Sequence, residues 1–498
     1  MRFSELLQEI QVVNTGGDLQ AELLGIAYDS RQVKPGFLFV AIKGFNTDGH
    51  RYLWQAVKQG AVAVVIERQT DLPDGVAWAQ VADGRQALAL LSARFYDNPS
   101  QKLQLVGITG TNGKTTIANL IAAVCETADK KVGLLGTIHN RIGGRIIQGS
   151  HTTPESKDLQ GLFQEMVDAG TDTCVMEVSS HALALHRVTG CEFDLAVFTN
   201  LTRDHLDLHG TPENYLAAKL KLFQELKTPG GKGNLKRAVI NADDRQSASF
   251  IEAVQSAGGM AVTYGIKKTA DVYADRIVVK SKGVRFTVRG NLGVCRLRLH
   301  LTGRFNVYNA LAAFTAGVLM GIPIEVIKEA LEGVPGVHGR FATVNAGQDF
   351  TVVVDYAHTP DGLENTLQTA RQLTNKRLIT VYGCGGDRDR GKRPIMGQIA
   401  AKYSDFQVIT SDNPRSEDQC DITNDILEGV RRIAKPEAYL VEEDRRRAIG
   451  LAINMAQTGD VVVIAGKGHE DYQLIGGETL PFDDTVEATE AIRRLVGG

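Results

Sequence analysis

The sequence predicts an α/β protein of three domains, in which a central parallel sheet holds a phosphate-binding loop. The chain has 498 residues, enough for about three domains of ordinary size. From residue 103 onward, short apolar runs alternate with helical stretches, which is typical of a parallel sheet covered by helices. The segment "LVGITGTNGKTT" (105–116) lies between an expected strand and an expected helix. We place the domains at residues 1–100, 101–336 and 337–498.

The first domain is expected to be small and to end at a proline-containing linker. Two strand-like runs, "LFVAI" (38–42) and "AVAVVIE" (61–67), precede one clear helix pattern at residues 85–97. "NPSQ" (98–101) follows this helix, and Asn-Pro is a strong breaker of regular structure.

The second and third domains are predicted from the period of their apolar residues. Residues 103–241 favour a parallel sheet with helices on both faces. Residues 271–301 alternate with period two, which indicates antiparallel hairpins, and a long apolar helix is expected at 306–320. After a glycine-rich linker at 332–341, strand-like runs at 377–383, 406–410 and 461–466 predict a Rossmann-like sheet.

Composition narrows the cellular setting. The net charge of −3 gives no bulk electrostatic attraction to nucleic acid. Six cysteines are scattered without a C-x-x-C pair, which fits free thiols in a reducing compartment. No apolar run is long enough to cross a bilayer, and the N-terminus does not resemble a signal peptide. We therefore expect a cytoplasmic protein, a monomer, with neither a nucleic-acid nor a membrane partner.

The phosphate loop predicts binding of a nucleotide with Mg²⁺. Gly110 and Gly113 allow a tight turn that points N–H groups at phosphate oxygens, and Lys114 can reach the terminal phosphates. Ile108 occupies the place of the first glycine in the usual pattern, so the loop is a variant. A kinase, a motor and a ligase all remain open. The predicted nucleotide contacts in this loop are Gly110, Thr111, Asn112, Gly113, Lys114, Thr115 and Thr116.

Acidic and histidine side chains follow in the same predicted domain. Glu177 ends an expected strand, at the sheet edge where ligands gather, and its carboxylate suits Mg²⁺. His205 and His209 are four apart and could share a helix face, but the H-E-x-x-H pattern of zinc enzymes is absent. Lys219 lies in a helix pattern, where a lysine is normally solvated.

Three loops of the third domain are expected to meet at one crevice, because each follows a strand of the same parallel sheet: residues 382–394, 410–418 and 465–471. They would bring together Arg388, Asn413, Arg415, Gly466 and Glu470. Two arginines and a glutamate suit a small zwitterion, since guanidinium binds carboxylate and glutamate accepts from ammonium. The alternative is a set of solvated charge runs that pair internally.

The motifs taken together resemble the Mur ligases of peptidoglycan synthesis. "GTNGKTT", "EVSSHAL", "FTNLTRDHLDLHGT", "YNALAA", "DYAHTP", "GGDRDRGKRP", "SDNPR" and "GKGHE" occur in this order and span all three segments. The resemblance implies a UDP-sugar-binding N-terminal domain, a central ATPase domain and a C-terminal amino-acid-binding domain. It also implies an ATP-dependent ligase that joins meso-diaminopimelate to the D-glutamate γ-carboxyl of UDP-N-acetylmuramoyl-L-alanyl-D-glutamate through an acyl phosphate.

The resemblance further implies the site residues. Lys114, Glu177, His205 and Lys219 would be catalytic; Thr115, Glu177, His205 and a CO₂-carbamylated Lys219 would hold Mg²⁺. Further ATP contacts would be Asn309, Arg340, Asp355, Tyr356 and His358, although turn chemistry around Pro360 also accounts for Asp355 and His358. The UDP-substrate would contact Ser30, Phe45, Asn46, Thr47, Thr152, Thr153, Ser179 and Arg187, whereas Leu185 stands where some members have a polar residue.

In the Mur ligases that this sequence resembles, the motif "DNPR" accompanies selection of diaminopimelate. The implied contacts are Arg388, Asp412, Asn413, Pro414, Arg415, Gly466 and Glu470. L-lysine lacks the distal carboxylate and would leave Arg415 unpaired. Ligation of lysine, a folylpolyglutamate synthase-like ligase, a P-loop kinase or NTPase switch, and a dinucleotide-binding module based on "GCGG" are the alternatives.

Overall fold

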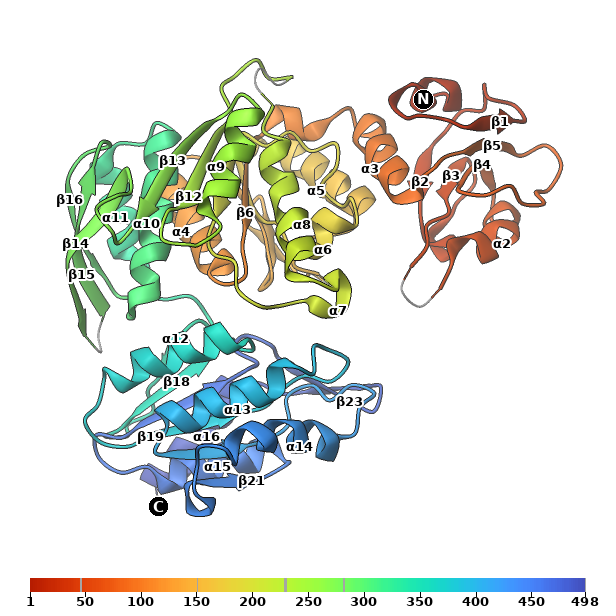
Figure 1. The fold of residues 1–498 in the computed structure, drawn as a ribbon. Coiled ribbons are helices and arrows are strands. Elements are labelled where there is room, and N and C mark those ends of the chain that lie inside the picture. Colours follow the sequence, from red (N-terminus) through yellow and green to blue (C-terminus); the bar gives the residue numbers. More distant parts are fainter. Residues whose placement is uncertain (45–46, 150, 228–230, 281–282, 498) are drawn as a thin grey trace.

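The computed structural model describes residues 1–44, 47–149, 151–227, 231–280 and 283–497, which form three bodies, each built on its own sheet (Figure 1). Within these ranges, no helix is long and apolar enough to cross a membrane. The short 3₁₀ helices are η1 (Leu7–Glu9), η2 (Ser30–Gln32), η3 (Gly49–Tyr52), η4 (Pro99–Lys102) and η5 (Pro436–Ala438).

The N-terminal body has a five-stranded sheet in the order β1-β5-β4-β3-β2. Only β1 pairs antiparallel. Its strands are β1 (Asn14–Gly16), β2 (Gly25–Ala27), β3 (Phe37–Val40), β4 (Ala61–Ile66) and β5 (Ala77–Gln80), and its helices are α1 (Phe3–Leu6), α2 (Leu53–Lys58) and α3 (Gly84–Phe95). The expected strands at 38–42 and 61–67 and the helix at 85–97 are confirmed. Asp83 starts α3 by accepting from the amides of Arg85 and Gln86.

The central body has an eleven-stranded sheet in the order β16-β15-β14-β13-β12-β11-β6-β10-β7-β8-β9. The strands are β6 (Gln104–Thr109), β7 (Val132–Leu135), β8 (Asn140–Ile142), β9 (Arg145–Ile147), β10 (Thr173–Glu177), β11 (Leu195–Phe198), β12 (Arg237–Asn241), β13 (Met260–Gly265), β14 (Val272–Lys280), β15 (Gly283–Gly290) and β16 (Cys295–Leu299). Pairing is parallel from β7 through β14 and antiparallel in β14-β15-β16, as expected. The hairpin β8–β9 extends the other edge, which the sequence did not predict.

Helices cover both faces of the central sheet because its strands are apolar on both sides. One core packs α4 and α10 against the sheet and the other packs α5, α8 and α9. The helices are α4 (Lys114–Thr127), α5 (Ser156–Asp168), α6 (Ser180–Ala184), α7 (Leu206–His209), α8 (Pro212–Gln224), α9 (Ser247–Ser256), α10 (Arg304–Leu319) and α11 (Ile324–Gly333).

The C-terminal body has a six-stranded sheet in the order β17-β18-β22-β19-β20-β21, parallel except at β17. Its strands are β17 (Ala342–Val344), β18 (Thr351–Asp355), β19 (Leu378–Tyr382), β20 (Phe406–Ile409), β21 (Tyr439–Val441) and β22 (Val461–Ala465), followed by the separate hairpin β23 (Tyr472–Ile475) and β24 (Glu478–Pro481). Its helices are α12 (Pro360–Arg371), α13 (Lys392–Tyr403), α14 (Gln419–Val430), α15 (Arg445–Met455) and α16 (Asp484–Val496). Cores on both faces give the Rossmann-like layering that the sequence predicts.

The central and C-terminal bodies meet where their loops carry the predicted motifs. In Figure 1, α12 lies on the side of the C-terminal body that faces the central body. Asn112 Nδ2 of the phosphate loop donates to Asp361 Oδ2 at the start of α12 (2.9 Å). Arg203 Nε lies 3.1 Å from Asp389 Oδ2 in the loop after β19. The carboxyl-end loops of the two sheets therefore share one junction.

Candidate functional site

The phosphate loop joins β6 to α4 through a backbone that only glycine fits. Gly110 has φ of +150° and Gly113 has φ of +89°. A Cβ at Gly110 would lie 1.8 Å from Thr199 Oγ1, closer than any atom can approach. The loop can therefore turn tightly against β11 and present the start of α4, with its free N–H groups, to an anion.

Two lysines converge on one carbonyl of this loop. Lys114 Nζ donates to the carbonyls of Gly110 and Thr111 (both 2.9 Å), and Lys219 Nζ donates to Gly110 O (2.8 Å). The expectation that Lys219 is solvated is wrong, because α8 packs it inward and leaves it 1% exposed. Burial lowers the pKa of Lys219 well below its ordinary value, and Lys114 lowers it further. The Tyr215 ring lies under it, with Nζ 4.7 Å from the ring centroid.

Thr115 and Glu177 form an oxygen-rich pair. Glu177, at the end of β10, is 1% exposed. Its carboxylate accepts from Thr115 Oγ1 (3.0 Å), Thr137 N (2.8 Å) and Thr137 Oγ1 (3.0 Å). Arg340 Nη2, from the C-terminal body, donates to Thr115 Oγ1 (2.8 Å). Mg²⁺ binds oxygen ligands, and a hydroxyl next to a carboxylate provides such oxygens.

The two histidines do not share a helix face, contrary to the expectation from their spacing. α7 is a single turn, and His205 precedes it with φ of +53°. His205 instead lies against His181, with ring centroids 4.6 Å apart, and its Nε2 is 3.2 Å from Asp204 Oδ2. Burial lowers the pKa of His205 to about 2, so the imidazole is neutral. No contact among the described residues joins His205 to Glu177, and none of their histidines, cysteines and acids form a three-residue metal group.

A cleft of about 510 Å³ lies beside the phosphate loop, between the central and C-terminal bodies. Of the predicted nucleotide contacts, the following line it: Asn112, Gly113, Thr116, Asn309, Arg340, Asp355 and Tyr356. The Arg340 guanidinium stacks over the Tyr356 ring, 4.6 Å from its centroid. Sequence reasoning missed other lining residues, including Asn241, Asp243, Tyr308 and Asp361. The signal for the first two was available, since "NADD" follows a strand that ends at this edge.

Asp355 and His358 mainly hold local structure. Asp355 accepts from Phe341 N (2.6 Å) and from Thr366 Oγ1 (2.9 Å). His358 Nδ1 donates to Tyr356 O (2.8 Å). Burial lowers the pKa of His358 to about 4. These bonds agree with the alternative based on turn chemistry before α12.

The residues predicted to contact a UDP-substrate fall in two places. Thr152, Thr153, Ser179 and Arg187 lie together beside Glu177 in the central body. Thr153 Oγ1 donates to Glu177 O (2.9 Å), and Arg187 Nη1 donates to Thr153 O (2.9 Å). Ser179 Oγ accepts from Ala182 N (3.1 Å) and so caps α6. Thr152 Oγ1 lies 3.1 Å from Thr137 Oγ1.

The other UDP-substrate candidates belong to the N-terminal body. Ser30 is buried and donates to Gln55 Oε1 (3.3 Å). Thr47 Oγ1 donates to the Tyr52 hydroxyl (3.2 Å). Phe45 and Asn46 lie outside the described residues.

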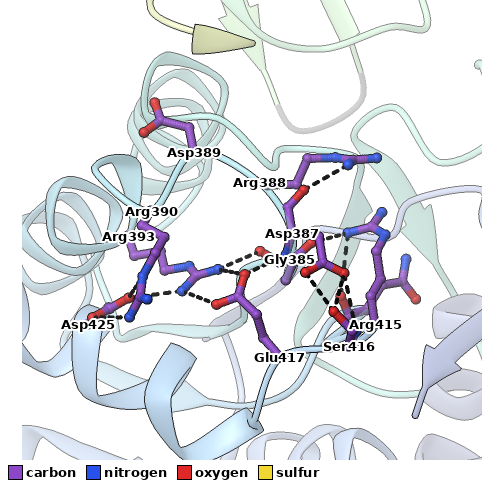
Figure 2. A network of polar contacts seen from close by, with 12 residues as sticks. Gly385, Asp387, Arg388, Asp389, Arg390, Arg393, Arg415, Ser416, Glu417 and Asp425 are labelled. Carbon is purple, nitrogen blue, oxygen red and sulfur yellow. Dashed lines mark hydrogen bonds and ion pairs between the residues drawn. The ribbon is translucent and has the colours of Figure 1, made fainter. Parts of the chain in front are cut away.

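The charge runs after β19 and β20 divide into paired and unpaired arginines (Figure 2). Arg393 is fully buried and binds Glu417 (2.8 Å) and Asp425 (2.9 Å), while Arg390 binds Asp425 (3.1 Å). Internal pairing is therefore the correct interpretation for these two arginines.

Arg388 and Arg415 differ, since neither has an ion-pair partner within the described part of the chain. Arg388 Nη1 donates to Asp387 O (2.9 Å), and Arg415 Nη1 donates to Gly386 O (2.7 Å). Burial lowers the pKa of Arg415, and the neighbouring Arg388 lowers it further. Figure 2 shows both guanidiniums apart from the Glu417 and Asp425 carboxylates. Two guanidiniums that form no ion pair within the described residues, at the carboxyl edge of a parallel sheet, can bind an anionic group.

The third loop adds a buried polar cluster. Lys467 Nζ donates to Asn413 Oδ1 and Glu470 Oε2 (both 3.0 Å), and Asn413 Nδ2 donates to Glu470 Oε2 (2.8 Å). Burial opposes ionisation of Asp412, but Lys467 and Arg445 outweigh it and lower its pKa. Sequence reasoning missed Lys467, which stands inside "GKGHE" and is 0% exposed. Glu470 is thus already partnered rather than free.

Backbone packing fixes these loops against one another. A Cβ at Gly466, where φ is +121°, would lie 2.5 Å from Asp412 Oδ2. A Cβ at Gly386 would lie 1.9 Å from Pro414 O. The structure therefore brings all seven predicted amine-site residues into the three loops of one sheet edge, which the register of β19, β20 and β22 places side by side.

Comparison with known proteins covers almost the whole chain. Residues 22–96, 108–317 and 339–468 match the family models of the Mur ligase catalytic domain, the Mur ligase middle domain and the Mur ligase glutamate ligase domain. The chain is 49% identical over 484 residues to the UDP-N-acetylmuramoyl-L-alanyl-D-glutamate–2,6-diaminopimelate ligase of Caldanaerobacter subterraneus subsp. tengcongensis, covering 97% of each chain. It is 48% identical to the protein of the same name from Syntrophomonas wolfei, covering 100% of both. A solved structure of a ligase of that name superposes with a TM-score of 0.69 at 34% identity, covering 100% of this chain and 99% of the other.

Proposed function

The chain belongs to the Mur ligase family, and from this premise we propose that it adds meso-diaminopimelate to UDP-N-acetylmuramoyl-L-alanyl-D-glutamate. It is an ATP-dependent acid–amino-acid ligase of peptidoglycan precursor synthesis. We propose that the reaction takes place in the cytoplasm, because its substrates are ATP and a soluble sugar nucleotide. The observation on which the choice of amine rests is the pair Arg388 and Arg415, which form no ion pair among the described residues.

The reaction has two bond exchanges. The γ-carboxylate oxygen of D-glutamate bonds to the γ-phosphorus of ATP as the bond to ADP breaks. The amine nitrogen then bonds to the acyl carbon, phosphate leaves, and the nitrogen loses a proton. A carboxylate approaching a triphosphate brings like charges together, so cations and N–H groups must offset them. Lys114 and the start of α4 supply these, and Arg340 reaches the same point from the other body.

Thr115 and Glu177 would hold Mg²⁺, since both side chains are buried and their oxygens lie 3.0 Å apart. When bound, the ion offsets phosphate charge. Lys219 would become a carbamate: its nitrogen bonds to the carbon of CO₂ and releases a proton. This needs a neutral amine, which the lowered pKa of the buried Lys219 supplies. His205, neutral by the same cause, is the remaining proposed ligand.

The cleft of about 510 Å³ beside the loop is the proposed ATP site, with Asn309, Arg340 and Asp355 among its walls. Thr152, Thr153, Ser179 and Arg187, next to Glu177, are proposed to hold the peptide end of the sugar nucleotide. Ser30 and the segment around Thr47 are proposed to hold its uridine. The proposed domain division remains 1–100, 101–336 and 337–498.

Diaminopimelate presents two amino-acid ends. One amine is the nucleophile, and the distal carboxylate would meet Arg388 and Arg415. L-lysine lacks this carboxylate, so its binding would leave the half-buried Arg415 unpaired. Hydrogen bonds to charged groups contribute about 1.5–3 kcal/mol each, which is enough for strong selection.

The test is ADP release by the purified full-length protein with ATP, Mg²⁺ and the sugar-nucleotide dipeptide. Meso-diaminopimelate is added in one reaction and L-lysine in another. Turnover with diaminopimelate alone is expected. Equal turnover with lysine would overturn the assignment of the arginines, and absence of amine-dependent turnover would overturn the ligase assignment.

A further inference from the structure

The hairpin β23–β24 lies against the loop that contains Arg415, outside the three strand-end loops discussed above. Ile475 and Glu478 pair across the turn, so the connection is the two residues Gly476 and Gly477. Their φ angles of +58° and +86° fit a type I′ turn, which matches the twist of a tight hairpin. The short turn fixes the register in which the two strands pair.

Backbone bonds from this hairpin enclose Arg415. The amide of Arg415 donates to Leu474 O (3.0 Å), and the amide of Gly476 donates to Arg415 O (3.0 Å). Arg415 itself has φ of +55°, in the left-handed region that residues with a Cβ rarely adopt. A single strained residue of this kind persists only where its surroundings over-determine it. The two flanking bonds from the hairpin do so here.

Side-chain hydrogen bonds from the hairpin also hold the residues just before Arg415. We call these bonds, together with the two backbone bonds to Arg415, the clamp. Gln473 is 6% exposed, and its Nε2 donates to Ser411 Oγ (2.7 Å) and Asp412 O (2.9 Å). The amide of Leu474 donates to Asn413 Oδ1 (2.9 Å). The hairpin thus contacts four of the five residues from Ser411 to Arg415. Because the Gln473 side chain donates both amide hydrogens to this one loop, it fixes the position of the loop.

We propose that the β23–β24 hairpin determines amine selection, with Gln473 as the positioning residue that holds Arg415 in its carboxylate-binding geometry. Gln473 does not touch the substrate; it acts through the loop. This inference rests on the proposed function, because it assigns the element that fixes the amine-binding arginine. An arginine that is displaced binds a carboxylate less well than one held in place, since bidentate bonding needs both N–H groups aligned.

The main variant is Gln473→Met, which keeps the volume and removes both donors. Ser411→Ala removes one of the two acceptors and gives a milder perturbation. The control is Leu480→Ala, because Leu480 pairs with Gln473 across the hairpin but is 42% exposed. For each protein, KM is measured for diaminopimelate, ATP and the sugar nucleotide, together with the thermal midpoint.

Gln473→Met is expected to raise KM for diaminopimelate by about tenfold or more, with a smaller rise for Ser411→Ala. The KM values for ATP and the sugar nucleotide should stay unchanged in all variants. The ratio of turnover with diaminopimelate to turnover with lysine should fall. An unchanged KM for diaminopimelate, a parallel rise in all three KM values, or an equal effect of Leu480→Ala would overturn the proposal.

Hydrogen exchange separates this inference from the proposed function, because it needs no substrate. Without ligand, Gln473→Met should accelerate amide exchange in residues 410–418, and Leu480→Ala should not. Failure of the wild-type protein to use any amine, with the effect of Gln473→Met on exchange still present, would refute the proposed function and the role in amine selection, but not the positioning of the loop by Gln473. Unaltered exchange in Gln473→Met would refute the positioning role itself.

Discussion

Replacing Arg415 by methionine is expected to abolish selection of the amine while leaving the fold intact. Within the described residues Arg415 pairs with no acid, and its guanidinium donates to backbone carbonyls of Gly386 and Asn413. The substitution therefore leaves no buried carboxylate without a partner. The change in the free energy of unfolding should be within about 1 kcal/mol, as for substitutions that break no buried pair.

The loss in activity follows from the bonds that a carboxylate would make. Two charge-assisted hydrogen bonds at about 1.5–3 kcal/mol each give about 3–6 kcal/mol. At about 1.4 kcal/mol per factor of ten, kcat/KM for diaminopimelate should fall by about 10²–10⁴. The value for lysine, which has no group for Arg415, should be nearly unchanged. Both are measured by ADP release at varied amine.

Arg393→Met is the matched control at the same sheet edge, because Arg393 lies at the start of α13, just after the loop that follows β19. Arg393 is fully buried, and its loss leaves Glu417 and Asp425 without their guanidinium. Breaking a buried pair on one side costs about 3–5 kcal/mol, which urea unfolding would show. The reasoning is refuted if Arg415→Met destabilises the fold as much as Arg393→Met, or if its preference between the two amines stays that of the wild type.

Three further outcomes are expected. The Arg393 guanidinium lowers the pKa of Glu417 below its ordinary 4.5. Glu417→Gln should therefore lower the free energy of unfolding by its full amount above pH 4.5, and by progressively less as the pH falls through the lowered pKa. An equal loss of stability at all pH values in urea titrations would contradict this. Arg340→Ala removes the bond to Thr115 Oγ1 and should raise KM for ATP about tenfold without altering KM for the amine in steady-state assays. Of the six thiols, Cys420 alone is exposed and should react first with a thiol reagent in the folded protein, and a second fast thiol would count against the packing.

The fold was predictable because its signals are local. Apolar runs and their period gave the strands of both large sheets, and the two-residue alternation gave β15 and β16. The glycines of the phosphate loop specified its turn. The hairpin β8–β9 was missed because it consists of two three-residue strands, too short for any period to show.

The site was predictable only where side chains follow strand ends. Arg388, Asn413 and Arg415 were placed together because parallel strands end at one edge. Burial of helix residues depends on tertiary packing, so Lys219 was expected to be solvated although it is buried. Arg445 shows the same limit. In "EDRRRAI" it reads as one charge of a run, yet it is buried against Asp484 and donates to Ser411 O and Ala465 O.

The division between paired and unpaired arginines has an evolutionary consequence. Arg390 and Arg393 anchor the end of the loop after β19 to Asp425 of α14, and Arg393 also binds Glu417 just before that helix, so substitutions there are opposed by the stability of the fold. Arg388 and Arg415 form no ion pairs in the described part of the chain, so substitutions there break none. Substitutions at these two positions can therefore change which amine binds, while the ion pairs of Arg390 and Arg393 keep the loop folded. A lineage could change the chemistry of its cell wall without first having to rebuild the enzyme.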